Sequence, residues 1–194
     1  IGLENSLKSF GLQSGRDFVI QQTLEADEGH SVRPDAVVFL PSDSVLVIDC
    51  KASKFLFDLA SAKEEEEKET ASENLRRTMR MHLRTLCSRD YESAIQADYR
   101  RTGKANQIRR TLNIMYLPNE GAIEKISEID PGFAADAAKK RITVVGPTGL
   151  LAIIAFARID IDLGQQAENQ EKIVDATRIL LERTAIMLEH AGRV

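Results

Sequence analysis

Residues 33–51 read Arg-Pro-Asp-Ala-Val-Val-Phe-Leu-Pro-Ser-Asp-Ser-Val-Leu-Val-Ile-Asp-Cys-Lys. Two runs rich in Val, Leu, Ile and Phe, residues that favour strands, lie on either side of Pro41-Ser42-Asp43-Ser44. Proline, serine and aspartate are typical of turns, because they preset or stabilise the backbone angles that a turn requires. The stretch therefore predicts a β-hairpin.

The hairpin brings acidic side chains together at its open end. With the pairing centred on Ser42, Asp35 and Asp49 lie directly opposite one another, and the Cβ atoms of opposed residues are roughly 4.5–5.5 Å apart. Side chains alternate along a strand, so Asp49 and Lys51 share one face while Cys50 points to the other. A register shifted by one residue would place the two aspartates on opposite faces.

Two carboxylates this close repel each other unless a cation lies between them. Mg²⁺ or Mn²⁺ suits this position because hard cations prefer oxygen ligands, and the backbone carbonyl of Cys50 offers a third oxygen. A water molecule on such an ion loses a proton readily and can attack phosphorus. Lys51 would orient that water or stabilise charge on the phosphate oxygens.

Each piece of this pattern also has a purely structural interpretation. Pro-Asp at the start of a strand is common in turns, and Asp49 with Lys51 could form a solvated ion pair. The combination at hairpin spacing, after two apolar strands, favours the metal site.

Short motifs spread over nearly the whole chain resemble the RmuC family, and the aspartates and lysine resemble the PD-(D/E)xK nuclease superfamily. The motifs that carry the resemblance are Leu3-Glu4-Asn5-Ser-Leu7, Ser31-Val-Arg33-Pro34-Asp35, Val47-Ile-Asp49-Cys-Lys51, Met115-Tyr-Leu-Pro118-Asn-Glu120 and Val144-Val-Gly-Pro147-Thr148-Gly-Leu150-Leu151.

The resemblance implies a restriction-endonuclease-like α/β fold, with a mixed central sheet flanked by helices. It implies that Asp35 and Asp49 bind the metal and that Lys51 is catalytic. The implied activity is that of a Mg²⁺- or Mn²⁺-dependent DNA endonuclease or exonuclease, acting on recombination or repair intermediates. A catalytically silent DNA-binding module that retains the nuclease fold, and limits recombination by occupying DNA, is the alternative.

Nucleases of this superfamily usually add a glutamate from the first helix, and the resemblance implies a Trp-Gly-Glu segment just ahead of Leu3. The chain begins at Ile1, so we expect it to be a fragment without that glutamate. Glu4 lies one turn further along the same face and is a substitute candidate, although an exposed helix glutamate is the commoner explanation. RmuC relatives also carry an N-terminal membrane anchor, implying attachment of the whole protein to the inner membrane.

Composition is consistent with one α/β domain over 1–194. The chain is 43% hydrophobic and long enough to fold without disulfides or a structural metal. It has no apolar run of about 20 residues, so no membrane contact is expected of it. Cys50 and Cys87 are unpatterned, which predicts a reducing cytoplasm and no zinc site. No motif for a small-molecule cofactor appears; Gly146-Pro147-Thr148-Gly149 is better explained as a helix start than as a phosphate-binding turn.

The periodicity of apolar residues predicts the remaining elements. We expect a first helix to Phe10, a strand near 18–20, and a long helical region after the hairpin. Strands are expected at 112–116 and 141–145, and helices near 120–128, 147–158 and 166–190. The last helix carries apolar heptad positions, which indicate either packing on the domain or self-association.

Charge is unevenly distributed, although the net charge is only −4. Residues 76–110 contain ten basic residues against three acidic ones, a local net charge of +7. Arginine favours helices, so a solvated amphipathic helix is one explanation; contact with DNA phosphates is the other. The candidate phosphate contacts are Arg76, Arg77, Arg80, Arg84, Arg100 and Arg101.

Overall fold

The computed structural model describes residues 2–25, 31–40, 43–101 and 110–156, together with 174, 177 and 178. The chain divides into two compact units, residues 1–154 and 155–194. The architecture below is that of the first unit. The predicted helix at 166–190, and with it self-association, lies outside the continuously described residues, and one domain over 1–194 stays a prediction.

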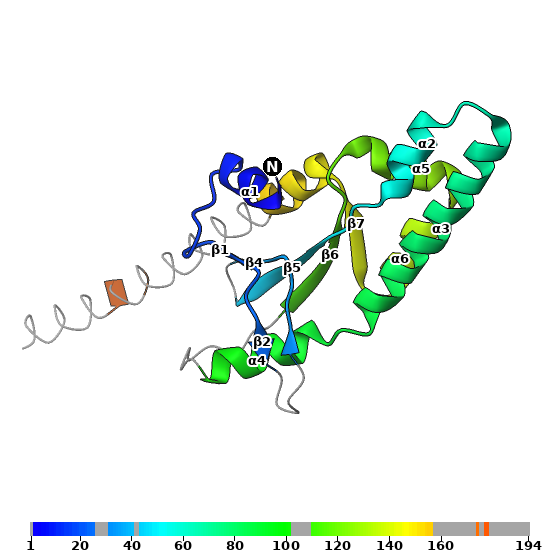
Figure 1. The fold of residues 1–194 in the computed structure, drawn as a ribbon. Coiled ribbons are helices and arrows are strands. Elements are labelled where there is room, and N and C mark those ends of the chain that lie inside the picture. Colours follow the sequence, from blue (N-terminus) through cyan, green and yellow to red (C-terminus); the bar gives the residue numbers. More distant parts are fainter. Residues whose placement is uncertain are drawn as a thin grey trace, which may run out of the picture. The chain divides into compact units, whose positions relative to one another are not determined.

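A five-stranded mixed sheet with the order β1-β4-β5-β6-β7 forms the centre of the fold (Figure 1). Its strands are β1 (Phe18–Ile20), β4 (Ala36–Leu40), β5 (Ser44–Cys50), β6 (Arg110–Tyr116) and β7 (Ile142–Val145). The first three pair antiparallel, whereas β5, β6 and β7 run parallel to one another. The predicted α/β fold with a mixed central sheet is confirmed.

The hairpin has the register that the sequence predicted. Ala36 lies opposite Ile48 and Leu40 opposite Ser44, so the pairing is centred on position 42. Strands β2 (Leu24–Glu25) and β3 (Ser31–Val32), which the sequence analysis did not predict, form a separate two-stranded sheet.

Six helices lie before residue 140 in the described part of the chain: α1 (Leu3–Ser9), α2 (Lys54–Ser61), α3 (Glu65–Cys87), α4 (Tyr91–Arg101), α5 (Glu120–Ile129) and α6 (Phe133–Lys139). A further helix begins at residue 147. The expected long helical region after the hairpin is therefore three helices, and α6 was not predicted. Within the described residues, no helix is long and apolar enough to cross a membrane.

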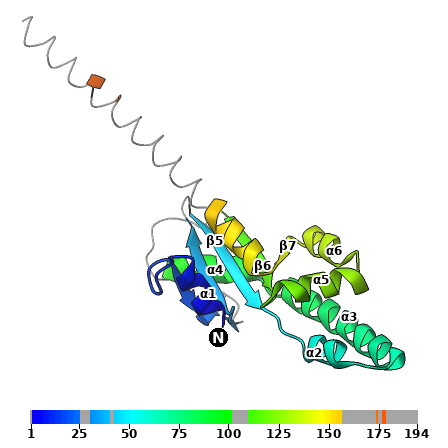
Figure 2. The ribbon, with the colours of Figure 1, turned by 90° about the horizontal axis from the view of Figure 1, so that it is seen from above.

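The two faces of the sheet bury different helices. Val37, Val45 and Val47 pack with α3 and its neighbours on one face, and Ala36, Leu46 and Ile48 pack with α1 on the other. Figures 1 and 2 show α1 and α3 on opposite sides of β4 and β5. Alternation along β5 thus sends odd-numbered side chains towards α3.

The longest helix, α3, is built to lie along the sheet. Its buried residues Ala71, Leu75, Met79, Leu83 and Leu86 recur at helical spacing. Glu64 and Glu67 form a capping box at its start, where acidic side chains also complement the helix dipole. The four consecutive glutamates at 64–67 therefore form the N-terminal end of α3.

Candidate active site

The carboxyl ends of the parallel strands meet at one edge of the sheet. Cys50 is paired with Tyr116, and Tyr116 with Val145, at the ends of β5, β6 and β7. The amide of Lys51 donates to the carbonyl of Tyr116 (2.8 Å), which continues the pairing past β5. In open α/β sheets, ligands bind outside this edge, and Asp49 and Lys51 lie on it.

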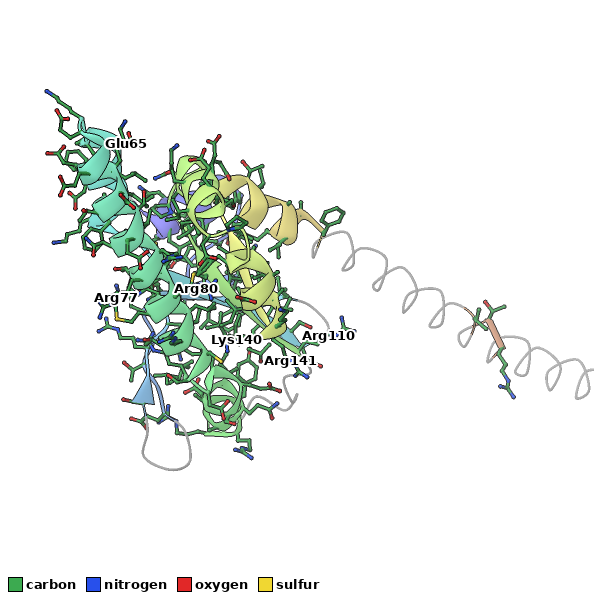
Figure 3. All side chains as sticks on the ribbon, turned by 90° about the vertical axis from the view of Figure 1, so that its right-hand side faces the viewer. Glu65, Arg77, Arg80, Arg110, Lys140 and Arg141 are labelled. Atoms are coloured by element: carbon green, nitrogen blue, oxygen red, sulfur yellow. The ribbon has the colours of Figure 1, made fainter. Side chains whose placement is uncertain are left out.

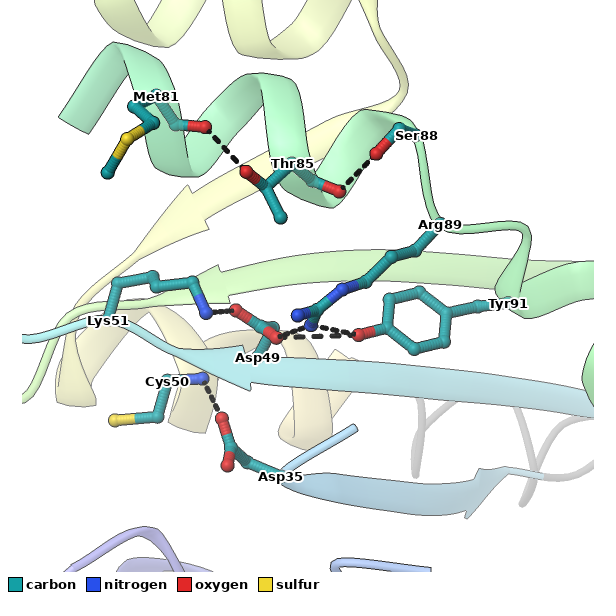
Figure 4. Close-up of polar contacts among 9 residues, drawn as sticks. All are labelled: Asp35, Asp49, Cys50, Lys51, Met81, Thr85, Ser88, Arg89 and Tyr91. Atoms are coloured by element: carbon teal, nitrogen blue, oxygen red, sulfur yellow. Dashed lines mark hydrogen bonds and ion pairs between the residues drawn. The ribbon is translucent and has the colours of Figure 1, made fainter. Parts of the chain in front are cut away.

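Asp35 sits beside the end of β5, as the register requires. It directly precedes β4, and its Oδ2 accepts a hydrogen bond of 2.7 Å from the amide of Cys50 (Figure 4). The carboxylate of Asp35 is thus held next to the residue that follows Asp49. Cys50 reaches the site through its backbone amide, and the ligand role of its carbonyl stays a prediction.

Asp49 is the most enclosed charged group of the site, with only 3% of its side chain exposed. Its Oδ1 accepts a hydrogen bond of 2.8 Å from Nη1 of Arg89 and a longer one of 3.4 Å from the hydroxyl of Tyr91. Its Oδ2 forms an ion pair with Nζ of Lys51 but has no hydrogen bond from the described residues. Two cations therefore flank one buried carboxylate (Figure 4).

Arg89 and Tyr91 support each other as well as Asp49. Nη1 of Arg89 donates to the Tyr91 hydroxyl at 3.0 Å. Burial, reinforced by the Asp49 carboxylate, raises the pKa of Tyr91 to about 12, so the hydroxyl keeps its proton at neutral pH. The hydrogen bond with Tyr91 is the main cause that raises the pKa of Arg89, and Asp49 and Asp35 add to it.

His82, on α3, also faces this group. Burial lowers its pKa below the ordinary value of about 6.5, and the nearby Lys51 cation lowers it further, whereas Asp49 acts in the opposite direction. The protonation of His82 therefore depends on the charges of Lys51 and Asp49. No motif in the sequence connects His82 with the site.

Glu4, the candidate third carboxylate, has an ion-pair partner on its own helix, and its role as a metal ligand stays a prediction. It forms an ion pair of 2.8 Å with Lys8 on α1, and both side chains are about half exposed. Helix α1 packs through Leu3 and Leu7 on the sheet face opposite to that of α3. Among the residues that the structure describes, no three His, Cys, Asp or Glu side chains gather closely enough to hold one metal ion.

The motifs at 115–120 and 144–151 contact each other at the same sheet edge, and this contact stabilises the start of a helix. Oε1 of Glu120 accepts a hydrogen bond of 2.7 Å from the amide of Thr148, at the start of the helix that begins at residue 147. A Cβ atom at Gly146 would lie 2.5 Å from Oε2 of Glu120, so a side chain there would displace the Glu120 carboxylate. Glu120 thus caps this helix, and the expected helix start is confirmed.

The candidate DNA-contacting arginines separate into paired and unpaired side chains. Arg80 forms a bidentate pair with Asp130 (2.6 and 2.7 Å) and a bond of 3.2 Å to Asp136. Arg101 pairs with Glu25 and Asp98, and Arg76 pairs with Glu73.

Arg77 and Arg84 are exposed and have no ion-pair partner in the described part of the chain, and Arg100 is exposed at the end of α4. Phosphate contact by all six arginines stays a prediction.

Basic side chains of α3 and α6 line two hollows in the surface. One, of about 570 Å³, includes Arg76, Arg77 and Arg84 in its lining. The other, of about 340 Å³, lies between Arg84 and the end of α6, where Lys139 and Lys140 contribute. We call this surface, defined by Arg77, Arg84, Lys139 and Lys140, the basic groove. Figure 3 shows Arg77, near the middle of α3, and Lys140, at the end of α6, away from Glu65 at the acidic start of α3.

The model of the RmuC family matches the chain over residues 1–194. The chain belongs to the RmuC family. The similar curated proteins bear out this assignment. A DNA recombination protein RmuC homolog of Rickettsia bellii is 37% identical over 194 residues, which is all of this chain and 43% of the relative.

More distant members of the RmuC family also match. The DNA recombination protein RmuC homolog of Pseudomonas aeruginosa is 28% identical over 87% of this chain and 35% of its own length. That of Vibrio cholerae is 28% identical over 91% of this chain and 32% of its own length. The chain thus spans less than half the length of these curated relatives. No solved structure matches it significantly.

Proposed function

We propose that this RmuC-family chain takes part in DNA recombination as a metal-dependent deoxyribonuclease that hydrolyses phosphodiester bonds. The observation that carries the proposal is the buried Asp49–Lys51 pair, placed beside Asp35 at the carboxyl edge of the parallel strands. The names of the relatives support a role in DNA recombination.

The residues present suit a hard divalent cation such as Mg²⁺ or Mn²⁺. Asp49 presents its carboxylate at the sheet edge beside Asp35, and its buried Oδ2 is already paired with positive charge, the Lys51 ammonium. Asp49 and Asp35 would hold the ion through oxygen atoms, which such cations prefer. The ion would supply Lewis-acid stabilisation of the phosphoryl oxygens.

Lys51 would act on the reacting groups directly. Its ammonium lies on the α3 face of the sheet beside Asp49, with 17% of the side chain exposed. An ammonium in this place can donate hydrogen bonds to the attacking water or to the phosphoryl oxygen on which charge accumulates. Asp49 would orient the ammonium through their ion pair.

The basic groove would hold the DNA backbone. Arg77 and Arg84 project from the side of α3 that faces away from the buried core positions Leu75, Met79 and Leu83. An α-helix with its side chains is about 10 Å across, a distance over which one DNA strand presents about three phosphates. A DNA strand that crosses this side of α3 would therefore place several phosphates beside Arg77 and Arg84.

Cleavage assays test the proposal. Linear, nicked and single-stranded DNA are incubated with Mg²⁺ or Mn²⁺ and wild-type protein, Asp49→Asn or Lys51→Met. We expect each substitution to reduce the cleavage rate at least about a hundredfold, with an unchanged circular dichroism spectrum.

Matched controls are Asp58→Asn and Lys54→Met, which change the same residue types on the adjacent helix α2 and should cleave at the wild-type rate. Equal cleavage by wild type, Asp49→Asn and Lys51→Met would rule out this active site.

A catalytically silent DNA-binding module is the second candidate. The specific observation in its favour is that Lys51 and Arg89 already balance the charge of Asp49 in this structure. DNA binding by wild-type protein without cleavage of linear, nicked or single-stranded DNA, with either Mg²⁺ or Mn²⁺, would support this candidate over the nuclease.

A further inference from the structure

The charges around Asp49 balance without any added ion. Asp49 contacts Lys51 through Oδ2 and Arg89 through Oδ1. Asp35 is fixed by the amide of the adjacent Cys50 and acts electrostatically on Arg89. The charges of two carboxylates and two cations therefore cancel. Arg89 contacts Oδ1 of Asp49, the carboxylate that binds the metal ion in the proposed function.

The fold holds Arg89 in this position from a short link. Arg89 lies between the end of α3 at Cys87 and the start of α4 at Tyr91. Tyr91 is 1% exposed and accepts a hydrogen bond from the guanidinium while its hydroxyl also contacts Asp49. The Arg89 guanidinium thus donates to both Tyr91 and Asp49, and the burial of Tyr91 makes these contacts part of the folded core.

We propose that Arg89 is a built-in competitor of the divalent cation at Asp49, an inference that rests on the proposed function. A divalent ion placed on Asp49 would meet the Arg89 guanidinium on the same carboxylate. Like charges at such distances repel strongly in a partly buried site, where water screens them poorly. Metal binding and the Arg89–Asp49 contact therefore exclude each other.

Arg89, rather than Lys51, is the cation that leaves. The Arg89 side chain is 35% exposed, whereas that of Lys51 is 17% exposed and follows directly on β5. A guanidinium that swings out from the link needs a new partner, and phosphate oxygens bind it in bidentate geometry. DNA thus favours metal binding by accepting Arg89, and metal favours DNA binding to the same extent.

The affinity for Mn²⁺ alone, without DNA, tests the competition. Free Mn²⁺ is measured by electron paramagnetic resonance on wild-type protein and on Arg89→Gln and Arg89→Lys. Arg89→Gln should bind Mn²⁺ about tenfold more tightly, because the competing charge is gone. Arg89→Lys keeps the charge and should stay near the wild-type Kd.

Two further variants make the measurement specific. Tyr91→Phe removes the hydroxyl that holds Arg89 and should tighten Mn²⁺ binding by a smaller factor, so the test does not depend on the folding of one variant. Arg16→Gln removes the same charge from a surface turn after α1, where Arg16 pairs with Asp17, and should leave the Kd unchanged.

The outcomes separate the two proposals. Tighter binding by Arg89→Gln that disappears when Asp49→Asn is added supports the competition. Equal or weaker binding by both Arg89→Gln and Tyr91→Phe overturns it, while binding by wild type that Asp49→Asn abolishes leaves the metal site standing. If no variant binds Mn²⁺, the competition and the proposed metal site both fall.

Discussion

The pKa of His82 depends on the charge of Lys51, so this histidine links the candidate site to the pH dependence of stability. Burial and the Lys51 cation lower its pKa, so the neutral imidazole is the form that the folded protein stabilises. The unfolded chain binds a proton at this histidine at a higher pH than the folded chain does. The contribution of His82 to stability is therefore present above the unfolded pKa of about 6.5 and is lost as pH falls towards the folded pKa.

We predict that the NMR titration midpoint of His82 in the metal-free protein lies below 6.5, the ordinary value for histidine. Replacing Lys51 with Met should raise this midpoint, because one neighbouring cation is removed. Asp49→Asn should lower it, because the carboxylate favours the imidazolium. Lys8→Met, on the opposite face of the sheet, serves as the control. If neither Lys51→Met nor Asp49→Asn changes the midpoint, the pKa of His82 does not depend on the charges of the site.

The sequence predicted some residues of the candidate site but not others. Asp35, Asp49 and Lys51 could be placed together because strand alternation and hairpin register are local rules. Arg89 and Tyr91 are about 40 residues away in the chain, and Arg89 counted only as one more basic residue. Their place at Asp49 depends on how α3 and α4 pack, for which neither residue carries a sequence signal.

Among the elements, α3 is joined to the C-terminal cap of α5 by a bidentate ion pair between Arg80 and Asp130, which we call the fork. Asp130 is only 8% exposed and receives two hydrogen bonds from the guanidinium. Asp136 of α6 receives a third. Arg80 therefore stabilises the packing of three helices, and contact of this arginine with a phosphate stays a prediction.

We predict that Arg80→Ala lowers the free energy of unfolding by about 1–2 kcal/mol, because a mostly buried carboxylate loses its partner. Arg77→Ala, on the exposed side of the same helix, should change it by less than about 0.5 kcal/mol. Urea unfolding measures both. Combining Arg80→Ala with Asp130→Asn should recover part of the loss. Equal effects of Arg80→Ala and Arg77→Ala would contradict a structural role for the fork.

The elements themselves were predictable where the apolar pattern is long or strictly periodic. The hairpin strands, β6, β7 and α5 lie within a few residues of their expected positions. The two-residue strands β2 and β3 and the seven-residue helix α6 are too short to show a period, and tertiary packing determines them. Within residues 54–101, Ser53 caps the start of α2 and Glu64 caps the start of α3. The consecutive charged residues from 63 to 69 obscured the second of these caps in the sequence.

Across the whole chain, charge is segregated although the net charge is −4. The acidic start of α3 and the basic groove lie towards opposite ends of that helix (Figure 3). A negatively charged polymer would therefore be attracted to one region and repelled from another. The unpaired cations of the groove, rather than the total charge, should determine how strongly DNA binding depends on salt.

The last prediction concerns this salt dependence. In the triple variant Arg77→Ala, Arg84→Ala, Lys140→Ala, the slope of log K against log salt for duplex DNA should become shallower by about 2.7, because each lost phosphate contact removes about 0.9. The control triple Lys8→Ala, Arg16→Ala, Lys125→Ala removes equal charge outside the groove and should change the slope little. Fluorescence anisotropy at several salt concentrations measures both. Equal flattening by the two triples would mean that DNA responds to net charge, and that the groove is not its path.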